Sequence, residues 1–171
     1  DIKIFDQPMS ADRYDLKAKI GYVPQEIAVF DELSVYDNID FFCGLYIQDK
    51  ATRKQYVEEA IEFVGLNDFR KFVPKKLSGG LKRRLNLACG LAHKPELLIL
   101  DEPTAGLDPG GRDEIFELIK DLHANNDMTV ILSSHSMDDM AKLVNTLMVM
   151  NKGRLEIMGS PREVFRRMQT G

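Results

Sequence analysis

Apolar residues recur with two different spacings along this chain, and the spacings predict its elements. Short apolar runs, which are typical of strands, occur at Ile2–Phe5, Lys19–Val23, Leu97–Leu100, Thr129–Ser133 and Leu147–Asn151. Apolar positions three and four residues apart, which are typical of helices, occur within Ser34–Phe69 and at Arg112–Ala124, Ser136–Val144 and Pro161–Met168. Strands that alternate with helices predict an α/β fold with a mostly parallel sheet and, near its end, a hairpin that turns at Lys152-Gly153.

The longest helical block has recognisable ends. Ser34 is suited to cap its first helix because Asp37 follows three residues later, and Gly65 is suited to end its second helix. The block lies within the 51 residues between Gln25 and Leu77 and contains no long heptad repeat. We therefore expect a compact group of helices here rather than a coiled coil.

One apolar run ends in two adjacent carboxylates. Asp101 and Glu102 directly follow the buried-type run at 97–100 and precede Pro103. Buried parallel strands deliver polar groups at their carboxyl ends, and carboxylates in such a place can hold Mg²⁺ and water. A charged strand end without a function is the alternative, but two unused carboxylates after so apolar a run would be costly.

A second segment is suited to bind an anion. Ser78, Gly79 and Gly80 open onto a segment with apolar residues at helical spacing. Backbone N–H groups at a helix start form an anion site, and glycine leaves them accessible. A carboxylate pair together with an anion-binding helix start predicts phosphoryl chemistry.

Five motifs, in this order, carry a resemblance to a known family. They are Tyr22–Gln25 (YVPQ), Leu77–Leu81 (LSGGL), Leu97–Glu102 (LLILDE), Ala105–Asp108 (AGLD) and His135 after TVILSS. They resemble the Q-loop, the signature, the Walker B strand, the D-loop and the switch histidine of ATP-binding-cassette (ABC) nucleotide-binding domains. The resemblance runs from about Ile20 to the C-terminus.

The resemblance implies a role for each matching residue. Asp101 would order the Mg²⁺ shell, Glu102 would be the general base that activates water, and His135 would contact the γ-phosphate. Gln25 would contact Mg²⁺ or the water. Ser78, Gly79 and Gly80 would bind the phosphates of a partner's ATP, and Asp108 is placed among the nucleotide-binding residues. An ordinary turn amide at Gln25 and a capping histidine at His135 are the alternatives.

The resemblance also implies a domain organisation and partners. Residues 26–76, with the signature helix to about 93, would form a helical subdomain, and residues 1–25 and 94–171 a core of the RecA-like type. ATP and Mg²⁺ would be the cofactors. Two such domains would face head to tail, and the pair would power transport through a transmembrane permease subunit at the cytoplasmic face of the cell membrane.

The sequence departs from the family pattern in three respects. No G-x-x-x-x-G-K-[ST] phosphate loop (Walker A) is present, so the simplest interpretation is a fragment that is inactive alone; a natural ATPase without this loop is the alternative. Leu81 stands where the signature usually has Gln. The part up to the D-loop resembles exporter ATPases and the rest resembles those of uptake systems, as a chimera or a divergent lineage would.

Composition and charge narrow the alternatives. A net charge of −4 and the lack of a heptad run disfavour a nucleic-acid partner and a soluble ABC ATPase of translation or DNA repair. A catalytically dead regulatory module stays possible on sequence alone. The cationic residues around the signature are expected to form a solvated helix face; they are Lys75, Lys76, Lys82, Arg83 and Arg84.

Two further sets of residues are expected to be mostly buried. Cys43 and Cys89 have apolar neighbours and no metal-like spacing, so both are expected to be reduced core residues. The aromatic residues that follow the Q-loop are expected to be mostly core, and any exposed subset would contact the membrane subunit. They are Phe30, Tyr36, Phe41, Phe42 and Tyr46.

Overall fold

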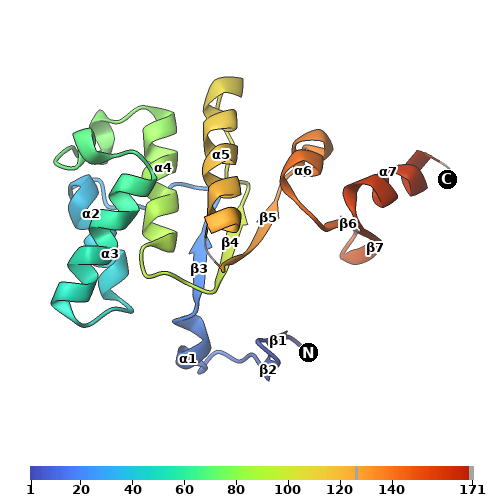
Figure 1. Cartoon of the computed structure of the whole chain (residues 1–171), viewed down its shortest axis with the longest axis horizontal. Helices are drawn as coiled ribbons and strands as arrows, with labels where there is room; N and C mark the ends of the chain where they lie inside the picture. The colour runs from blue at the N-terminus through green and yellow to red at the C-terminus, as the bar shows by residue number, and fades with distance from the viewer. Residues whose placement is uncertain (126, 170–171) are drawn as a thin grey trace. The chain divides into compact units, whose positions relative to one another are not determined.

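The computed structural model describes residues 1–125 and 127–169. The chain divides into two compact units, residues 1–133 and residues 134–171. Figure 1 shows the elements of each unit along the chain. The first unit contains the sheet and most of the helices.

The first unit is built on a three-stranded parallel sheet. Its strands are β3 (Ile20–Val23), β4 (Leu97–Asp101) and β5 (Thr129–Ser133), in the order β3-β4-β5. Val23 lies opposite Leu100 and Asp101 lies opposite Ser133. The predicted parallel α/β sheet is therefore confirmed, and the carboxyl ends of its strands meet at one edge.

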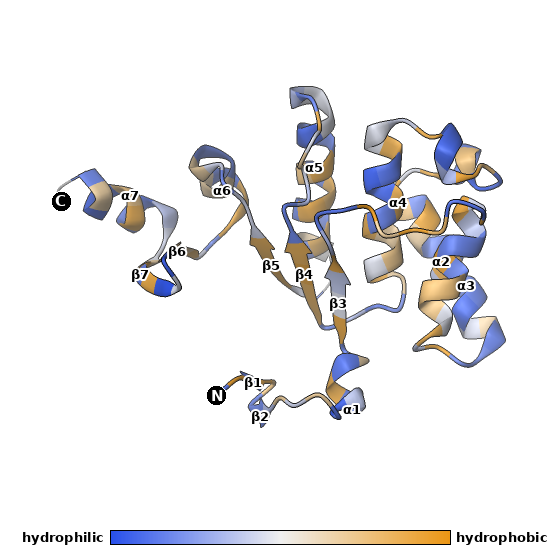
Figure 2. Ribbon diagram, turned by 180° about the vertical axis from the view of Figure 1, so that it is seen from behind, coloured by the Kyte–Doolittle hydropathy of each residue, from blue (hydrophilic) through white to orange (hydrophobic). Residues whose placement is uncertain are grey.

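Helices cover one face of this sheet. They include α4 (Gly79–Leu91), which contacts β3, and α5 (Pro109–Asn125), which contacts α4. Figure 2 shows the other face, where apolar strands have no helix in front of them. Tyr22, Ile99 and Ile131 are in register across that face, and Tyr22 and Ile131 are exposed. The residues between them in the strands, such as Leu98 and Leu100, are buried against the helices.

Two glycines allow α4 to lie close to β3. A Cβ on Gly21 would be 2.3 Å from the carbonyl oxygen of Gly90, and one on Gly90 would be 2.4 Å from a methyl carbon of Val23. Side chains do not approach backbone so closely. Glycine at both positions therefore sets the distance between helix and strand.

The remaining helices of the first unit form a group after the Q-loop. They are α2 (Val35–Gly44), α3 (Lys50–Phe63) and the short 3₁₀ helices Asn67–Phe69 and Pro74–Lys76. Ser34 caps α2 by accepting a 3.0 Å hydrogen bond from the Asp37 amide, and Gly65, at φ 70°, follows the end of α3. Both predicted helix ends are confirmed.

The structure corrects the sequence predictions in three places. The single strand expected at 2–5 is a small hairpin of β1 (Lys3–Ile4) and β2 (Gln7–Pro8), because Phe5 and Asp6 turn the chain at positive φ. The segment between this hairpin and β3, for which the pattern indicated no helix, contains α1 (Tyr14–Lys17), which is too short to give a periodic pattern. Helix α5 begins three residues before Arg112. Proline is favoured at a first helical position, and Asp108 caps the helix through the Gly111 amide at 3.3 Å.

The second unit is a small arrangement of two helices and a hairpin. Its elements are α6 (Met137–Leu143), β6 (Leu147–Asn151), β7 (Arg154–Gly159) and α7 (Pro161–Gln169). Strands β6 and β7 are antiparallel, and Lys152 and Gly153 turn the chain at φ 46° and 76°. The predicted hairpin is confirmed. The buried apolar residues of the described part of this second unit are Met140, Leu147 and Val164.

Of the two sets of side chains predicted to be mostly buried, the cysteines are buried and the aromatic residues are not. Cys43 and Cys89 are buried free cysteines, as expected. The aromatic residues expected in the core are not buried, and Phe30, Phe41 and Tyr46 are each at least 40% exposed. That expectation was wrong: Phe41 belongs to α2, Phe30 to the loop before it and Tyr46 to the segment after it, and the fold leaves all three partly accessible to solvent. Over residues 1–125 and 127–169, no helix has the length and apolar character needed to cross a bilayer.

Candidate functional site

A carboxylate pair stands at the carboxyl end of β4. Ser133, which ends β5 in register with Asp101, donates a 2.7 Å hydrogen bond to Asp101 Oδ1. The same hydroxyl accepts a 3.0 Å hydrogen bond from the Glu102 amide. One side chain of the neighbouring strand therefore fixes both the Asp101 carboxylate and the start of the turn that carries Glu102.

Glu102 has a backbone conformation that glutamate seldom adopts. Its φ is 45°, in the left-handed region. This region costs a residue with a Cβ about 1–2 kcal/mol, and such strain is concentrated at functional sites. The surroundings hold the conformation, because the Glu102 amide bonds to Ser133 and its carbonyl accepts from the Ala105 amide at 3.1 Å.

The Q-loop segment, defined here as residues 24–34, follows β3 and has no regular structure of its own. Asn86 of α4, which is 3% exposed, holds its first part. The side-chain amide of Asn86 donates to the Pro24 carbonyl and its oxygen accepts from the Ala28 amide, both at 3.1 Å. A buried amide side chain that is satisfied by backbone groups fixes the path of a loop.

Asn38 of α2 holds the second part of the same segment. It is fully buried, and its oxygen accepts a 2.8 Å hydrogen bond from the Phe30 amide. Its NH₂ group lies 3.0–3.1 Å from the carbonyl oxygens of Phe30, Leu33 and Ser34. The Q-loop segment is therefore held by two asparagines that belong to two different helices.

Arg83 of α4 connects the Q-loop segment to the turn after the carboxylates. Its Nη1 donates to the Gln25 carbonyl, and its Nη2 donates to the Ala105 carbonyl at 2.8 Å. Partial burial lowers the pKa of Arg83 from its ordinary value, but an arginine stays charged at neutral pH. The Gln25 side chain itself is exposed at the carboxyl edge of the sheet.

The signature residues form the start of α4. The Ser78 hydroxyl caps the helix by accepting a 3.3 Å hydrogen bond from the Leu81 amide. A Cβ added to Gly79 or to Gly80 would meet nothing within 4 Å. The amino end of the helix, where backbone N–H groups favour an anion, is therefore open to a group that approaches from outside the chain.

Two predicted site residues, Asp108 and His135, belong to none of the three parts of the site described above, namely the carboxylates, the Q-loop segment and the signature helix. Asp108 is exposed and acts as the cap of α5. His135 belongs to the second unit, where it is exposed between Ser133 and the start of α6. The structure thus brings together the carboxylates, the Q-loop segment and the signature helix, and it describes His135 separately from them.

The donor groups fit Mg²⁺ better than a metal held by the protein alone. Within the described part of the chain, no cluster of three or more histidine, cysteine, aspartate or glutamate side chains could hold a metal ion. Mg²⁺ is instead bound by one or two carboxylates together with substrate phosphates and water. Asp101 meets this requirement, since it is half-buried at the strand end and Ser133 engages its Oδ1 oxygen.

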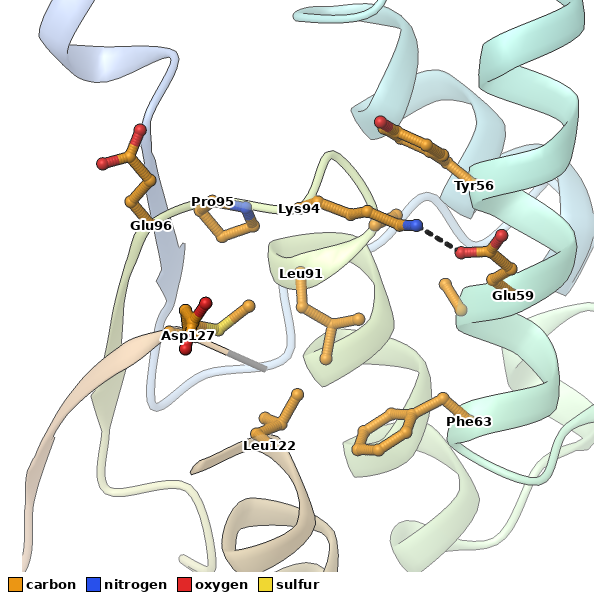
Figure 3. A pocket seen from close by; sticks show the side chains of 12 residues that line it. Tyr56, Glu59, Phe63, Leu91, Lys94, Pro95, Glu96, Leu122 and Asp127 are labelled. Atoms are coloured by element: carbon orange, nitrogen blue, oxygen red, sulfur yellow. Dashed lines mark ion pairs between the residues drawn. The ribbon is translucent and has the colours of Figure 1, made fainter. Parts of the chain in front are cut away.

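A pocket of about 570 Å³ lies at the opposite end of the sheet (Figure 3). Lys94 reaches across it, pairs with Glu59 and lies 4.3 Å from the centre of the Tyr56 ring. Glu96, next to the start of β4, is also part of its lining. Because ligands of parallel α/β sheets bind at the carboxyl ends of the strands, this pocket is not the place for the phosphates.

The sequence did not indicate several of the residues that build the site, among them Ser133, Arg83 and Asn86. Ser133 is a polar residue at the carboxyl end of a predicted strand, and this position could have indicated that it lies near the carboxylates. Arg83 and Asn86 are three residues apart on α4 and therefore share a face. The solvated helix face expected for the cations was wrong for Arg83 and for Arg84, which bonds to the Val64 carbonyl at 3.1 Å and to Glu114 at 2.6 Å.

Comparison with known proteins identifies the family. A sequence profile described as "ABC transporter" matches residues 1–105, which is more than half of the chain. The chain belongs to the ABC transporter family.

Members of this family similar to the chain include two kinds of ATP-binding protein. "Energy-coupling factor transporter ATP-binding protein EcfA2" of Clostridioides difficile is 51% identical over 156 residues, which are 89% of this chain and 54% of that protein. "Linearmycin resistance ATP-binding protein LnrL" of Bacillus subtilis is 39% identical over 152 residues, 89% of this chain and 49% of that protein. The chain spans about half the length of the curated relatives it matches.

A solved structure of the family has the same fold. It is cbiO1 of Clostridium perfringens, described as part of the ABC transporter complex cbiONQ. It superimposes with a TM-score of 0.87 at 30% sequence identity and covers 98% of this chain and 68% of its own. The family resemblance and the α/β fold class are therefore confirmed.

Proposed function

We propose that the protein is an ATP-binding and ATP-hydrolysing subunit that powers the transport of a substrate across a membrane. The observation that carries this proposal is the carboxylate pair at the tip of β4, fixed by Ser133 and joined through Arg83 to the Q-loop segment. The family and the names of the relatives, which are ATP-binding proteins of transporters and of drug resistance, support it.

In the proposed reaction, the two carboxylates have different roles. Asp101 helps to hold Mg²⁺, which would neutralise charge on the phosphates of bound ATP. Glu102 accepts a proton from the attacking water. Ser133 keeps the Asp101 carboxylate in place and holds the turn from which the Glu102 side chain extends. The family resemblance gives Gln25 a contact to Mg²⁺ or the water, and gives Asp108 and His135 contacts to nucleotide.

The signature would act on ATP bound by a second domain. Ser78 and the N–H groups of Gly79 and Gly80 bind the phosphates of that ATP when two domains face head to tail. The open space at both glycines supports this arrangement, because the approaching group comes from outside the chain. Charge on the phosphoryl group is then met from both sides only when the dimer closes, so hydrolysis requires closure.

A permease subunit would bind beside the Q-loop segment. Phe30 and Phe41 are 42% and 45% exposed, and their ring centres are 4.9 Å apart. An exposed aromatic pair at the segment that carries Gln25 is suited to receive a partner. In this proposal, residues 26–76 with the signature helix to about 93 are the helical subdomain, residues 1–25 and 94–171 belong to the RecA-like core, and the protein works at the cytoplasmic face of the membrane.

Ser78→Arg tests the proposed function. The experiment uses a protein in which residues 1–171 are joined to a phosphate loop, and this protein is the parent of each variant. ATP-driven dimerisation is measured beside the ATP affinity of the dilute monomer. We expect the variant to block dimerisation and to leave monomer affinity almost unchanged. Asp49→Arg is the control, because Asp49 caps α3 by accepting from a backbone amide in the same way but belongs neither to the signature nor to the Q-loop segment. A large loss of monomer affinity in Ser78→Arg would contradict a signature that acts in trans.

A further inference from the structure

We propose that Arg83 is a positioning residue that couples the signature to both the Q-loop segment and the turn after Glu102. This proposal rests on the proposed function, since it concerns how that site is held together. Arg83 lies on neither loop, yet its two terminal nitrogens bond to the carbonyls of Gln25 and Ala105. One side chain therefore joins two segments that are about 80 residues apart in the sequence.

The geometry requires a guanidinium. Arginine presents several N–H donors in a fixed plane, so two nitrogens can bond to two carbonyls at once. A lysine ammonium is a single point with a flexible stem and would reach one of them. Arg83 is also partly buried between the loops, where a hydrogen bond from a charged donor is stronger than in water.

Helix α4 connects this link to the signature. The helix begins at Gly79 after its Ser78 cap, and Arg83 follows within the second turn. A short piece of helix is stiff, so a displacement of the amino end on phosphate binding is carried to Arg83 and through it to both carbonyls. Binding at Ser78 would in this way reach the Gln25 segment and the Glu102 turn together.

The neighbouring Arg84 shows that this is not a general property of cations on α4. The bonds described for Arg83 go to loop carbonyls at the carboxyl edge of the sheet. Arg84 bonds instead to the Val64 carbonyl after α3 and to Glu114 on α5. Arg84 therefore ties helices to one another and provides a matched control of the same type, on the same helix.

Amide hydrogen exchange tests the link in the protein without nucleotide. Ala28, Ala105 and Leu107 have hydrogen-bonded amides close to the two contacts and report on the loops. We expect Arg83→Gln to speed exchange at these amides by about tenfold or more, because a charged hydrogen bond is lost at each loop. Phe30, whose amide is held by Asn38, should be unchanged. Arg84→Gln should leave all three loop amides unchanged.

Kinetics test the coupling in the same protein joined to a phosphate loop. We expect Arg83→Gln to lower kcat about tenfold with a KM for ATP within about twofold of the parent, because the chemistry and not nucleotide binding is affected. Arg83→Lys should give an intermediate kcat. Arg84→Gln should stay near the parent value.

The outcomes separate this proposal from the proposed function. Unchanged exchange at Ala28 and Ala105 in Arg83→Gln, or equal changes in Arg84→Gln, would overturn the link. So would a kcat near the parent value in Arg83→Gln. If the parent protein hydrolyses no ATP, the proposed function fails, and the exchange arm still decides whether Arg83 joins the two loops.

Discussion

The two ends of the central sheet are built in opposite ways. At the carboxyl end, half-buried and exposed polar groups gather, namely Asp101, Glu102 and Ser133, and Glu102 has a strained backbone. At the amino end, the strand and helix are joined tightly. Gly21 lies against Gly90, and the buried His93 bonds through Nε2 to the Ile20 carbonyl at 3.1 Å.

This difference separates the residues that stabilise the fold from those proposed to act on ATP. The amino end excludes side chains between helix and strand, so a substitution there changes the packing itself. The carboxyl end keeps its polar groups accessible, and hydrogen bonds rather than burial set their positions. Substitutions at the amino end should therefore lower stability, and those at the carboxyl end should lower activity.

The largest effect is expected from Gly21→Ala. The new Cβ would stand 2.3 Å from the Gly90 carbonyl oxygen, so α4 and β3 would have to move apart. We expect a loss of about 3 kcal/mol or more in the free energy of unfolding, measured with urea. Gly110→Ala is the control, because its Cβ would make only an ordinary 3.6 Å contact with Asp108. Equal stabilities of the two variants would contradict the tight contact.

The second-largest effect is expected from Glu102→Gln, which tests the carboxyl end of the sheet. It preserves size but removes the base, so turnover in the protein joined to a phosphate loop should fall about 10²-fold or more, while ATP binding and the closed dimer persist. Glu96→Gln is the control at the amino end, where Glu96 forms a partly exposed ion pair with Lys19 at 3.6 Å. Near-normal hydrolysis by Glu102→Gln would refute the role given to Glu102.

Ser133→Ala should have a smaller effect. It removes the hydroxyl that bonds to Asp101 and to the Glu102 amide, and a net loss of about 1 kcal/mol for each of these two hydrogen bonds corresponds to roughly 30-fold in rate. We expect lower turnover, a higher Mg²⁺ concentration for half-maximal rate and little change in unfolding. Ser133→Thr keeps the hydroxyl and should restore activity. If Ala and Thr variants behave alike, the hydroxyl does not position the carboxylates.

The smallest expected effect is a pH dependence of stability at the amino end. Burial lowers the pKa of His93, and within the described residues its Nδ1 has no hydrogen-bond partner. The unfolded chain then binds a proton more readily than the fold, so stability should decline as pH falls below about 6.5. Urea unfolding across pH 5–8 measures this. His93→Gln should flatten the profile, whereas a change at the exposed His123 should not.

The carboxyl end was more predictable from sequence than the contacts that hold it. Asp101 and Glu102 follow an apolar run, so their position at a strand tip could be inferred from the pattern alone. The contacts of Arg83 and Asn86 could not, because they join α4 to loops about 20 to 60 residues away and no local pattern records such a partner. Exposure of Phe30 and Phe41 was missed because apolar character alone does not say which side chains a fold buries.

The left-handed backbone conformation of Glu102 affects which residue selection retains at this position. A residue chosen for ease of folding alone would be glycine or asparagine there, since either occupies φ 45° at less expense. Laboratory selection for heat resistance without selection for turnover should therefore replace this glutamate early. If related proteins keep glutamate at this position, its retention would indicate selection for the hydrolytic reaction.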